Sequence, residues 1–227
     1  AAIAQAVSEA AFAALLFAAG GGLAWPIVRR LSPPSVPAAL RAATAAALGT
    51  WMLSVAVLSV GSSVPGSLTP WLWWPVVLAG AGLAGWFARS RFGDLRGARE
   101  VRAGILFYLL CGVVVGVWLG GAMRPPGLTG TLLADRAQVL RFHLQVPREW
   151  MHLGQVRTLE HNAFSFLPMG RHMLFLLGMV LRGGAYEGLY AAKALAGGVM
   201  VCGAVGLHAG RAASSMERAR MAVDLLG

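Results

Sequence analysis

Long apolar segments alternate with short polar ones along most of the chain. A helix needs about 20 mostly apolar residues to cross a bilayer. Five segments reach that length, namely residues 7–28, 38–60, 70–88, 103–122 and 185–209. Proline-rich "SPPSVP" separates the first from the second, and uncharged "GSSVPGSLTP" separates the second from the third. The pattern predicts an all-α integral membrane protein with five transmembrane helices.

The arginines indicate how these helices are oriented. They gather in the first connection, in the third connection around "RSRFGDLRGAREVR", and after the last apolar segment. The second connection, residues 61–70, carries no charge. Because basic residues accumulate on the cytoplasmic side of a membrane, we expect the N-terminus outside and the C-terminus in the cytoplasm.

The same orientation puts residues 123–184 on the outer face. This segment is too polar to cross the membrane, yet it keeps several aromatic residues and many leucines. Pro147 and Gly154 delimit a short helix, "PREWMHLG", and Pro168 can begin a second one, "PMGRHMLFLLGMVLRGG". We expect both to be interfacial helices that lie on the membrane. Three regions follow: four spans in 1–122, the outer loop in 123–184, and the fifth span with a cytoplasmic tail in 185–227.

The composition agrees with a membrane protein. The chain is 57% hydrophobic and 12% charged, whereas soluble domains carry about a quarter charged residues. The net charge of +10 comes from arginines at the ends of apolar segments, so it does not indicate a nucleic-acid partner. Cys111 and Cys202 each lie within an apolar segment, which gives no disulfide framework.

The apolar segments are rich in small residues, as in "FAAGGGLAW", "LAGAGLAGW" and "ALAGGVMVCGAVG". Such faces let helix backbones approach closely. They can serve packing within the chain or against another subunit, and the sequence leaves both open. For the run Gly20–Gly22 we favour a packing face over a ligand site.

Metal, haem and hydrolytic sites have little support in the sequence. Four of the five histidines lie in the outer segment and His208 lies in the last span, without HxxxH or CxxCH spacing. This disfavours haem, while imidazole ligands leave a divalent metal such as zinc or copper open. No GxSxG and no phosphate-cradling glycine loop occurs.

The outer segment carries about twice as many arginines as acidic residues before Glu187. Such a surface suits an anionic lipid headgroup or a lipid-linked phosphate. The other interpretation is that these arginines simply lie at the level of the headgroups.

A resemblance adds to this picture. The stretch "RFHLQVPREWMHLGQVRTLEHNAFSFLPMGRHMLFLLGMVLRGGAYEGLYAAKAL" resembles the first outer loop of bacterial GT-C-fold glycosyltransferases. The shared features are "LQVPREW", "HN-x-F-S", a following proline and "ML-x-LLGM". These enzymes transfer sugars from polyprenyl-phosphate donors, and the resemblance implies a place in the bacterial inner (cytoplasmic) membrane.

The resemblance also implies where catalytic carboxylates would lie. Gln138 stands at one acidic position of the family and His172 at the other. Gln138 cannot act as a general base, although Asp135, three residues earlier, could take that role. His172 could transfer protons in principle. Family members also usually continue with many more helices after this loop.

The sequence therefore predicts a non-catalytic, GT-C-like accessory or structural subunit without a cofactor. Its partners would be membrane lipids and other membrane protein subunits. An alternative is an active transferase of a polyprenyl-phosphate-linked sugar, with Asp135 as base and Arg141 or Arg171 on the donor phosphate. A third is a haem or metal subunit. The candidate partner- or lipid-binding residues are Arg141, His143, Trp150, His161, Asn162 and Arg171, and the candidate catalytic residues are Asp135 and His172.

Overall fold

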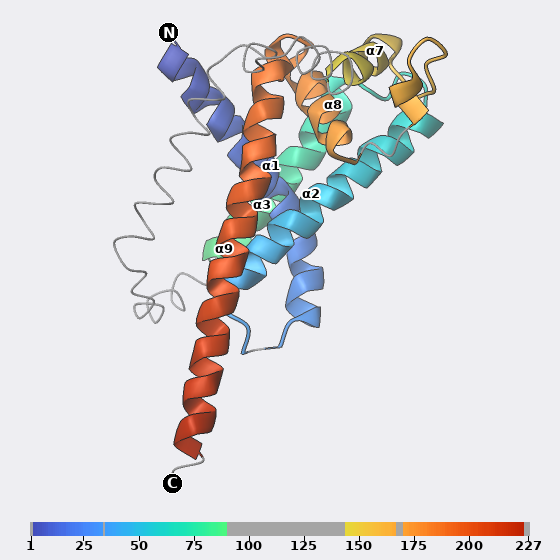
Figure 1. Ribbon diagram of the computed structural model, residues 1–227. Coiled ribbons are helices and arrows are strands. Elements are labelled where there is room, and N and C mark those ends of the chain that lie inside the picture. Colours follow the sequence, from blue (N-terminus) through green and yellow to red (C-terminus); the bar gives the residue numbers. More distant parts are fainter. Residues whose placement is uncertain (1, 34, 90–143, 167–169, 225–227) are drawn as a thin grey trace.

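The computed structural model describes residues 2–33, 35–89, 144–166 and 170–224 (Figure 1), all helix or connecting turns without a strand. Four of its helices are long and apolar enough to cross a membrane. They contain the predicted first, second and third spans and all but the first two residues of the predicted fifth, 185–209, whereas the predicted fourth span, 103–122, lies outside the described residues. These helices are α1 (Ala2–Leu31), α2 (Ala38–Ser63), α3 (Pro70–Arg89) and α9 (Glu187–Asp224).

The long helices pack as a bundle. Gly20 lies on Gly49 and Gly21 on Ala46, so α2 runs antiparallel to α1. Along α3, Gly80 packs beside Ala19, while further on the ring of Phe87 lies 6.2 Å from that of Trp25, so α3 runs parallel to α1. Helix α9 runs in the same direction as α1 and extends well beyond the bundle (Figure 1).

Small residues allow the close approach between these helices. A Cβ atom at Gly20 would lie 2.7 Å from the backbone nitrogen of Thr50, and one at Gly80 would lie 2.5 Å from the carbonyl oxygen of Ala19. Such contacts bring backbones together as in other membrane bundles. The predicted packing role of Gly20–Gly22 is therefore confirmed, and the packing is within the chain.

Hydroxyl groups inside the bundle find acceptors on their own helix. Thr50 donates to the carbonyl of Ala46 at 2.9 Å, and Ser54 donates to the carbonyl of Thr50 at 3.0 Å. Because the interior of a membrane offers no water to polar groups, such internal hydrogen bonds are needed there.

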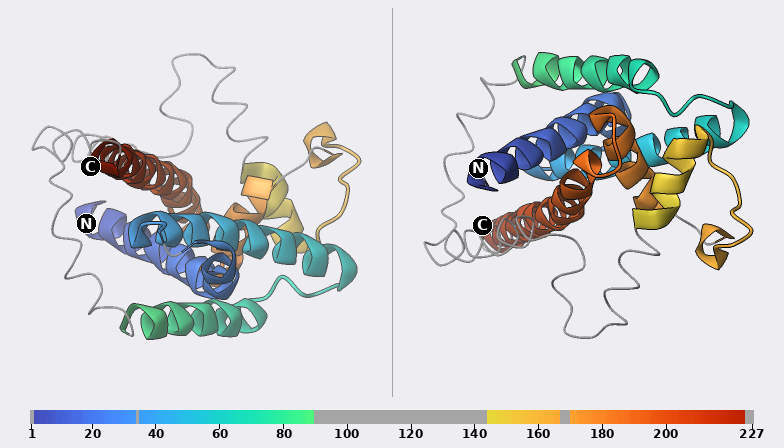
Figure 2. Two further views of the ribbon diagram at one scale, coloured as in Figure 1. Left: turned by 90° about the horizontal axis from the view of Figure 1, so that it is seen from below. Right: turned by 90° about the horizontal axis from the view of Figure 1, so that it is seen from above.

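Three short elements cover one end of the bundle: α7 (Val146–Leu153), a 3-10 turn at Ala163–Phe166 and α8 (Gly170–Arg182). We call residues 144–166 and 170–182 the cap, and the end that they cover the cap end (Figures 1 and 2). The opposite end is the arginine end, where α1 and α3 finish and α2 begins. It carries Arg29, Arg30, Arg41 and Arg89.

Backbone hydrogen bonds tie the cap to the last turn of α2 and to the connection that follows it. Gly66 donates to the carbonyl of Gly154 at 3.0 Å, and Val156 donates to that of Gly61 at 2.8 Å. The indole of Trp74 also donates to the carbonyl of Leu181 at 3.2 Å, which fixes the end of α8 against α3. The cap therefore belongs to the same packed unit as the bundle.

Helix α8 differs from the expected interfacial helix. Its residues from His172 to Leu181 are all buried, and Leu176, Leu177 and Met179 are fully enclosed. It inserts among α2, α3 and α9 and supplies much of the core (Figure 1). The prediction of a helix lying on the membrane is thus wrong for α8, because the neighbouring helices cover every side of it.

Candidate functional site

Trp150 organises the part of the cap that carries most of the polar groups. It lies on α7, which has Pro147 in its first turn and ends at Gly154, whose φ of 66° suits a glycine in the left-handed region. Trp150 is only 2% exposed, and its indole N–H donates to the carbonyl of Arg157. This hydrogen bond holds the segment after α7 close to the helix.

The returning segment brings His161 to Glu149. The Nε2 atom of His161 lies 2.7 Å from a carboxylate oxygen of Glu149, and the amide of Gln145 donates to the other oxygen at 2.8 Å. The side chain of Glu149 is 24% exposed and that of His161 is 63% exposed. The carboxylate is thus held from two sides, while the imidazole remains accessible.

A tight turn fixes the backbone around His161. The hydroxyl of Ser165 accepts from the backbone N–H of Leu159 at 2.8 Å and donates to the carbonyl of Asn162 at 2.8 Å. Asn162 is buried. The "HN-x-F-S" sequence therefore forms a local turn in which Ser165 and Asn162 have structural roles.

Helix α7 and the segment after it border an open hollow of about 670 Å³ on the surface of the cap. We call it the cap hollow. Its walls carry carboxylates, a guanidinium group and imidazoles. The hollow can therefore accept hydrogen bonds from a ligand and donate hydrogen bonds to it. Its lining residues are Glu149, His152, Leu153, Arg157, Thr158, Leu159, Glu160 and His161.

The predicted site residues do not all meet at this hollow. His161 lines it, and the indole of Trp150 donates to the carbonyl of Arg157, which also lines it. His172 lies buried on α8 with its ring 5.8 Å from that of Phe175, and it is not among the residues of the hollow. Arg171 is in the first turn of α8. Asp135, Arg141 and His143 lie outside the described residues.

The sequence argument did not select Glu149, His152, Arg157 or Glu160 as site residues. A usable signal exists in the spacing of Gln145, Glu149 and His152, because residues separated by three and four positions share one face of a helix. The pairing of Glu149 with His161 has no such signal, since it depends on the path of the intervening turn.

Among the described residues, no three His, Cys, Asp or Glu side chains gather closely enough to hold a metal ion. Glu149 and His161 supply two ligands, whereas bound zinc usually takes three or four protein ligands. These residues do not fit a resident metal.

Comparison with known proteins gives no relative: no family model, no curated protein and no solved structure matches this chain.

Proposed function

We propose that this protein is a multi-pass membrane subunit, similar to GT-C glycosyltransferases in its outer segment, that serves a structural or accessory role in a larger membrane assembly. The cap hollow is its docking surface, and it receives a polar segment of a partner subunit. Apolar helix faces contact the surrounding lipid.

The burial of His172 carries the non-catalytic part of this proposal. His172 occupies one of the two acidic positions of the family that the chain resembles, and it is 6% exposed beside an aromatic ring. A group that transfers protons to a substrate must come within hydrogen-bond reach of it. Gln138, at the other position, has no basic side chain.

The cap hollow supports the docking part. His161 is accessible and held by Glu149, and Arg157 and Glu160 add charges of both signs. Exposed polar side chains that are held in fixed positions give specificity at the rim of a protein–protein interface. Complementary charges there determine how the partner is positioned.

We also propose the orientation, with the cap end outside and the arginine end in the cytoplasm of a bacterial inner membrane. Four arginines lie where α1 and α3 end and α2 begins, and the connection between α2 and α3 is uncharged. Helix α3 ends at the arginine end, whereas α7 lies at the cap end (Figure 1), which supports a further crossing by the predicted span 103–122.

The test is purification of the tagged full chain in a mild detergent, followed by mass spectrometry of the proteins that stay bound in a fixed ratio. We expect one or more membrane proteins at constant stoichiometry. Replacing both Arg157 and His161 by alanine should lower the bound partner about tenfold, since a few residues dominate most interfaces.

Arg89→Ala at the other end is the matched control and should leave the partner bound. The proposal would be contradicted if no protein co-purified with the chain in a fixed ratio. It would also be contradicted if the double substitution left the amount of bound partner unchanged.

A second candidate is an active transferase of a polyprenyl-phosphate-linked sugar. It is favoured by one observation: the carboxylate of Glu149 orients an accessible imidazole, that of His161, at 2.7 Å in an open hollow. An oriented imidazole can accept a proton from an acceptor hydroxyl. Asp135 remains the other candidate base, with Arg141 or Arg171 on the donor phosphate.

The two bases are separated by mutation in a sugar-transfer assay on the purified protein. His161→Ala should lower the rate at least about 100-fold if the imidazole is the base, whereas Asp135→Asn should do so if that carboxylate is. Absence of transfer by the unmodified chain, with its partner present, removes this candidate.

A further inference from the structure

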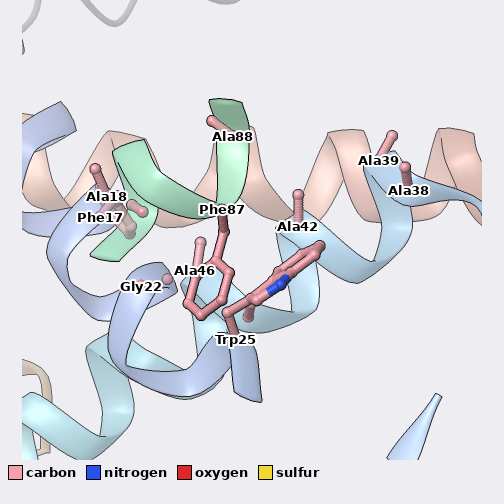
Figure 3. Close-up of a pocket in the computed structure, with 13 residues that line it drawn as sticks. Phe17, Ala18, Gly22, Trp25, Ala38, Ala39, Ala42, Ala46, Phe87 and Ala88 are labelled. Carbon is pink, nitrogen blue, oxygen red and sulfur yellow. The ribbon is translucent and has the colours of Figure 1, made fainter. Parts of the chain in front are cut away.

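An apolar groove opens between α1, α2 and α3 at the arginine end, opposite the cap hollow. Its volume is about 420 Å³. The rings of Trp25 and Phe87 lie side by side, tilted by 36°, and form one wall, while Ala42 and Ala46 lie across from them (Figure 3).

The groove exists because the side chains at the arginine end of the bundle are small. In the cap half of the bundle, large residues of α8 fill the space beside α2 and α3. In the other half the wall of α2 consists of alanines, and Ala39 and Ala42 are exposed. An exposed apolar groove at membrane depth is covered by hydrocarbon, so an alkyl chain is the natural occupant.

An arginine follows lining residues of the groove on each of the three helices. Arg29 follows Trp25 by four residues on α1, Arg41 follows Ala38 by three on α2, and Arg89 follows directly after Ala88 on α3. Residues three and four apart lie on one face of a helix, so the first two guanidinium groups extend from helix faces that line the groove.

These arginines have no carboxylate partner among the described side chains. The two ion pairs described, His161–Glu149 and Arg182–Glu9, are both at the cap end. Arg41 is partly buried, and its Nε atom has no hydrogen-bond acceptor among the described residues. An anionic group is the strongest acceptor for a guanidinium group.

We propose that this groove binds an anionic phospholipid of the surrounding leaflet. One acyl chain lies between Trp25, Phe87 and the alanines of α2, and the phosphate accepts hydrogen bonds from Arg41, with Arg29 and Arg89 nearby. Basic pockets between membrane helices on the cytoplasmic side recognise such headgroups. The assignment is independent of the proposed docking role, because the groove lies at the opposite end of the bundle.

The test is native mass spectrometry of the full chain in detergent with equal amounts of phosphatidylglycerol and phosphatidylcholine. We expect selective retention of phosphatidylglycerol. Arg41→Gln should lower its retention about fivefold, because it removes one positive charge of the protein from the surroundings of the headgroup. Ala42→Phe should lower retention of both lipids, because the added ring occupies the place of the acyl chain.

Two variants serve as matched controls. Arg148→Gln removes an exposed arginine at the cap end, and Val55→Phe adds a ring to an exposed position of α2 away from the groove. Both should bind phosphatidylglycerol as the unmodified chain does, and an unchanged elution volume in size-exclusion chromatography checks the fold of every variant.

Equal retention of the two lipids by the unmodified chain would overturn the inference. The same holds if Ala42→Phe and Arg41→Gln bind like their controls. Displacement of phosphatidylglycerol by a small amount of polyprenyl phosphate would reject the phospholipid as the occupant.

Discussion

The bundle and the cap are held together by different means. In the bundle, helix backbones come into direct contact at glycines, which have no side chain, as at Gly20 beside Thr50 and Gly80 beside Ala19. In the cap, large side chains fill the interior and polar groups secure the turns, as Trp150 does with the carbonyl of Arg157. The difference follows from the surroundings: lipid gives no hydrophobic drive for helices to associate, whereas a polar segment at the surface can use both burial and hydrogen bonds.

The largest expected effect tests the backbone contact in the bundle. Gly80→Ala should destabilise the protein by about 3 kcal/mol, since the new methyl group meets the backbone of Ala19 and backbone cannot move aside easily. Denaturant titration in detergent micelles measures the change.

Gly82→Ala, two residues further along α3, is the matched control. A Cβ there meets nothing within 4 Å, so this variant should be neutral or more stable, by up to about 1 kcal/mol from helix propensity. Equal losses for the two variants would show that the contact between α1 and α3 does not stabilise the bundle.

The next effect tests the junction of the two regions. Arg182 at the end of α8 lies 2.9 Å from the carboxylate of Glu9 on α1, and its guanidinium lies 4.5 Å above the ring of Phe12. Arg182→Leu should cost about 2 kcal/mol, less than for a fully buried pair, because this arginine is 27% exposed.

Replacing Glu9 by leucine as well should restore most of that loss, because no buried carboxylate is then left unpaired. Arg148→Leu is the control, since Arg148 lies 5.2 Å from the exposed ring of Tyr186, and removal of such a contact costs about 0.5–1 kcal/mol. A double variant no more stable than Arg182→Leu alone would argue against the ion pair as the link.

The smallest effect tests the hydrogen bond within the cap. Trp150→Phe removes the donor to the carbonyl of Arg157 and should cost about 1–2 kcal/mol. Trp71→Phe on the exposed start of α3 makes the same change where the ring is 73% exposed and should have no measurable effect. Unfolding followed by circular dichroism compares the two; equal midpoints would mean that the cap does not depend on this hydrogen bond.

The helical class, four helices long and apolar enough to cross a membrane, and the short helix α7 could all be predicted from the sequence. A helix that crosses lipid needs a long apolar segment, and arginines gather at its ends where the chain meets water, so both features can be recognised in the sequence. Pro147 and Gly154 mark the ends of α7 because each favours a particular backbone conformation. The small-residue runs also indicated a packing face at Gly20–Gly22.

Which side chains become neighbours depends on the tertiary fold. Glu149 and His161 are twelve residues apart and become neighbours because Trp150 and Ser165 fold the turn between them. Helix α8 carries an amphipathic pattern with polar ends, yet its neighbours bury it, because burial depends on helices that are distant in the chain. For the same reason, no pattern in the sequence distinguishes a small-residue face that closes on a neighbour, as at Gly20, from one that leaves a groove, as at Ala42.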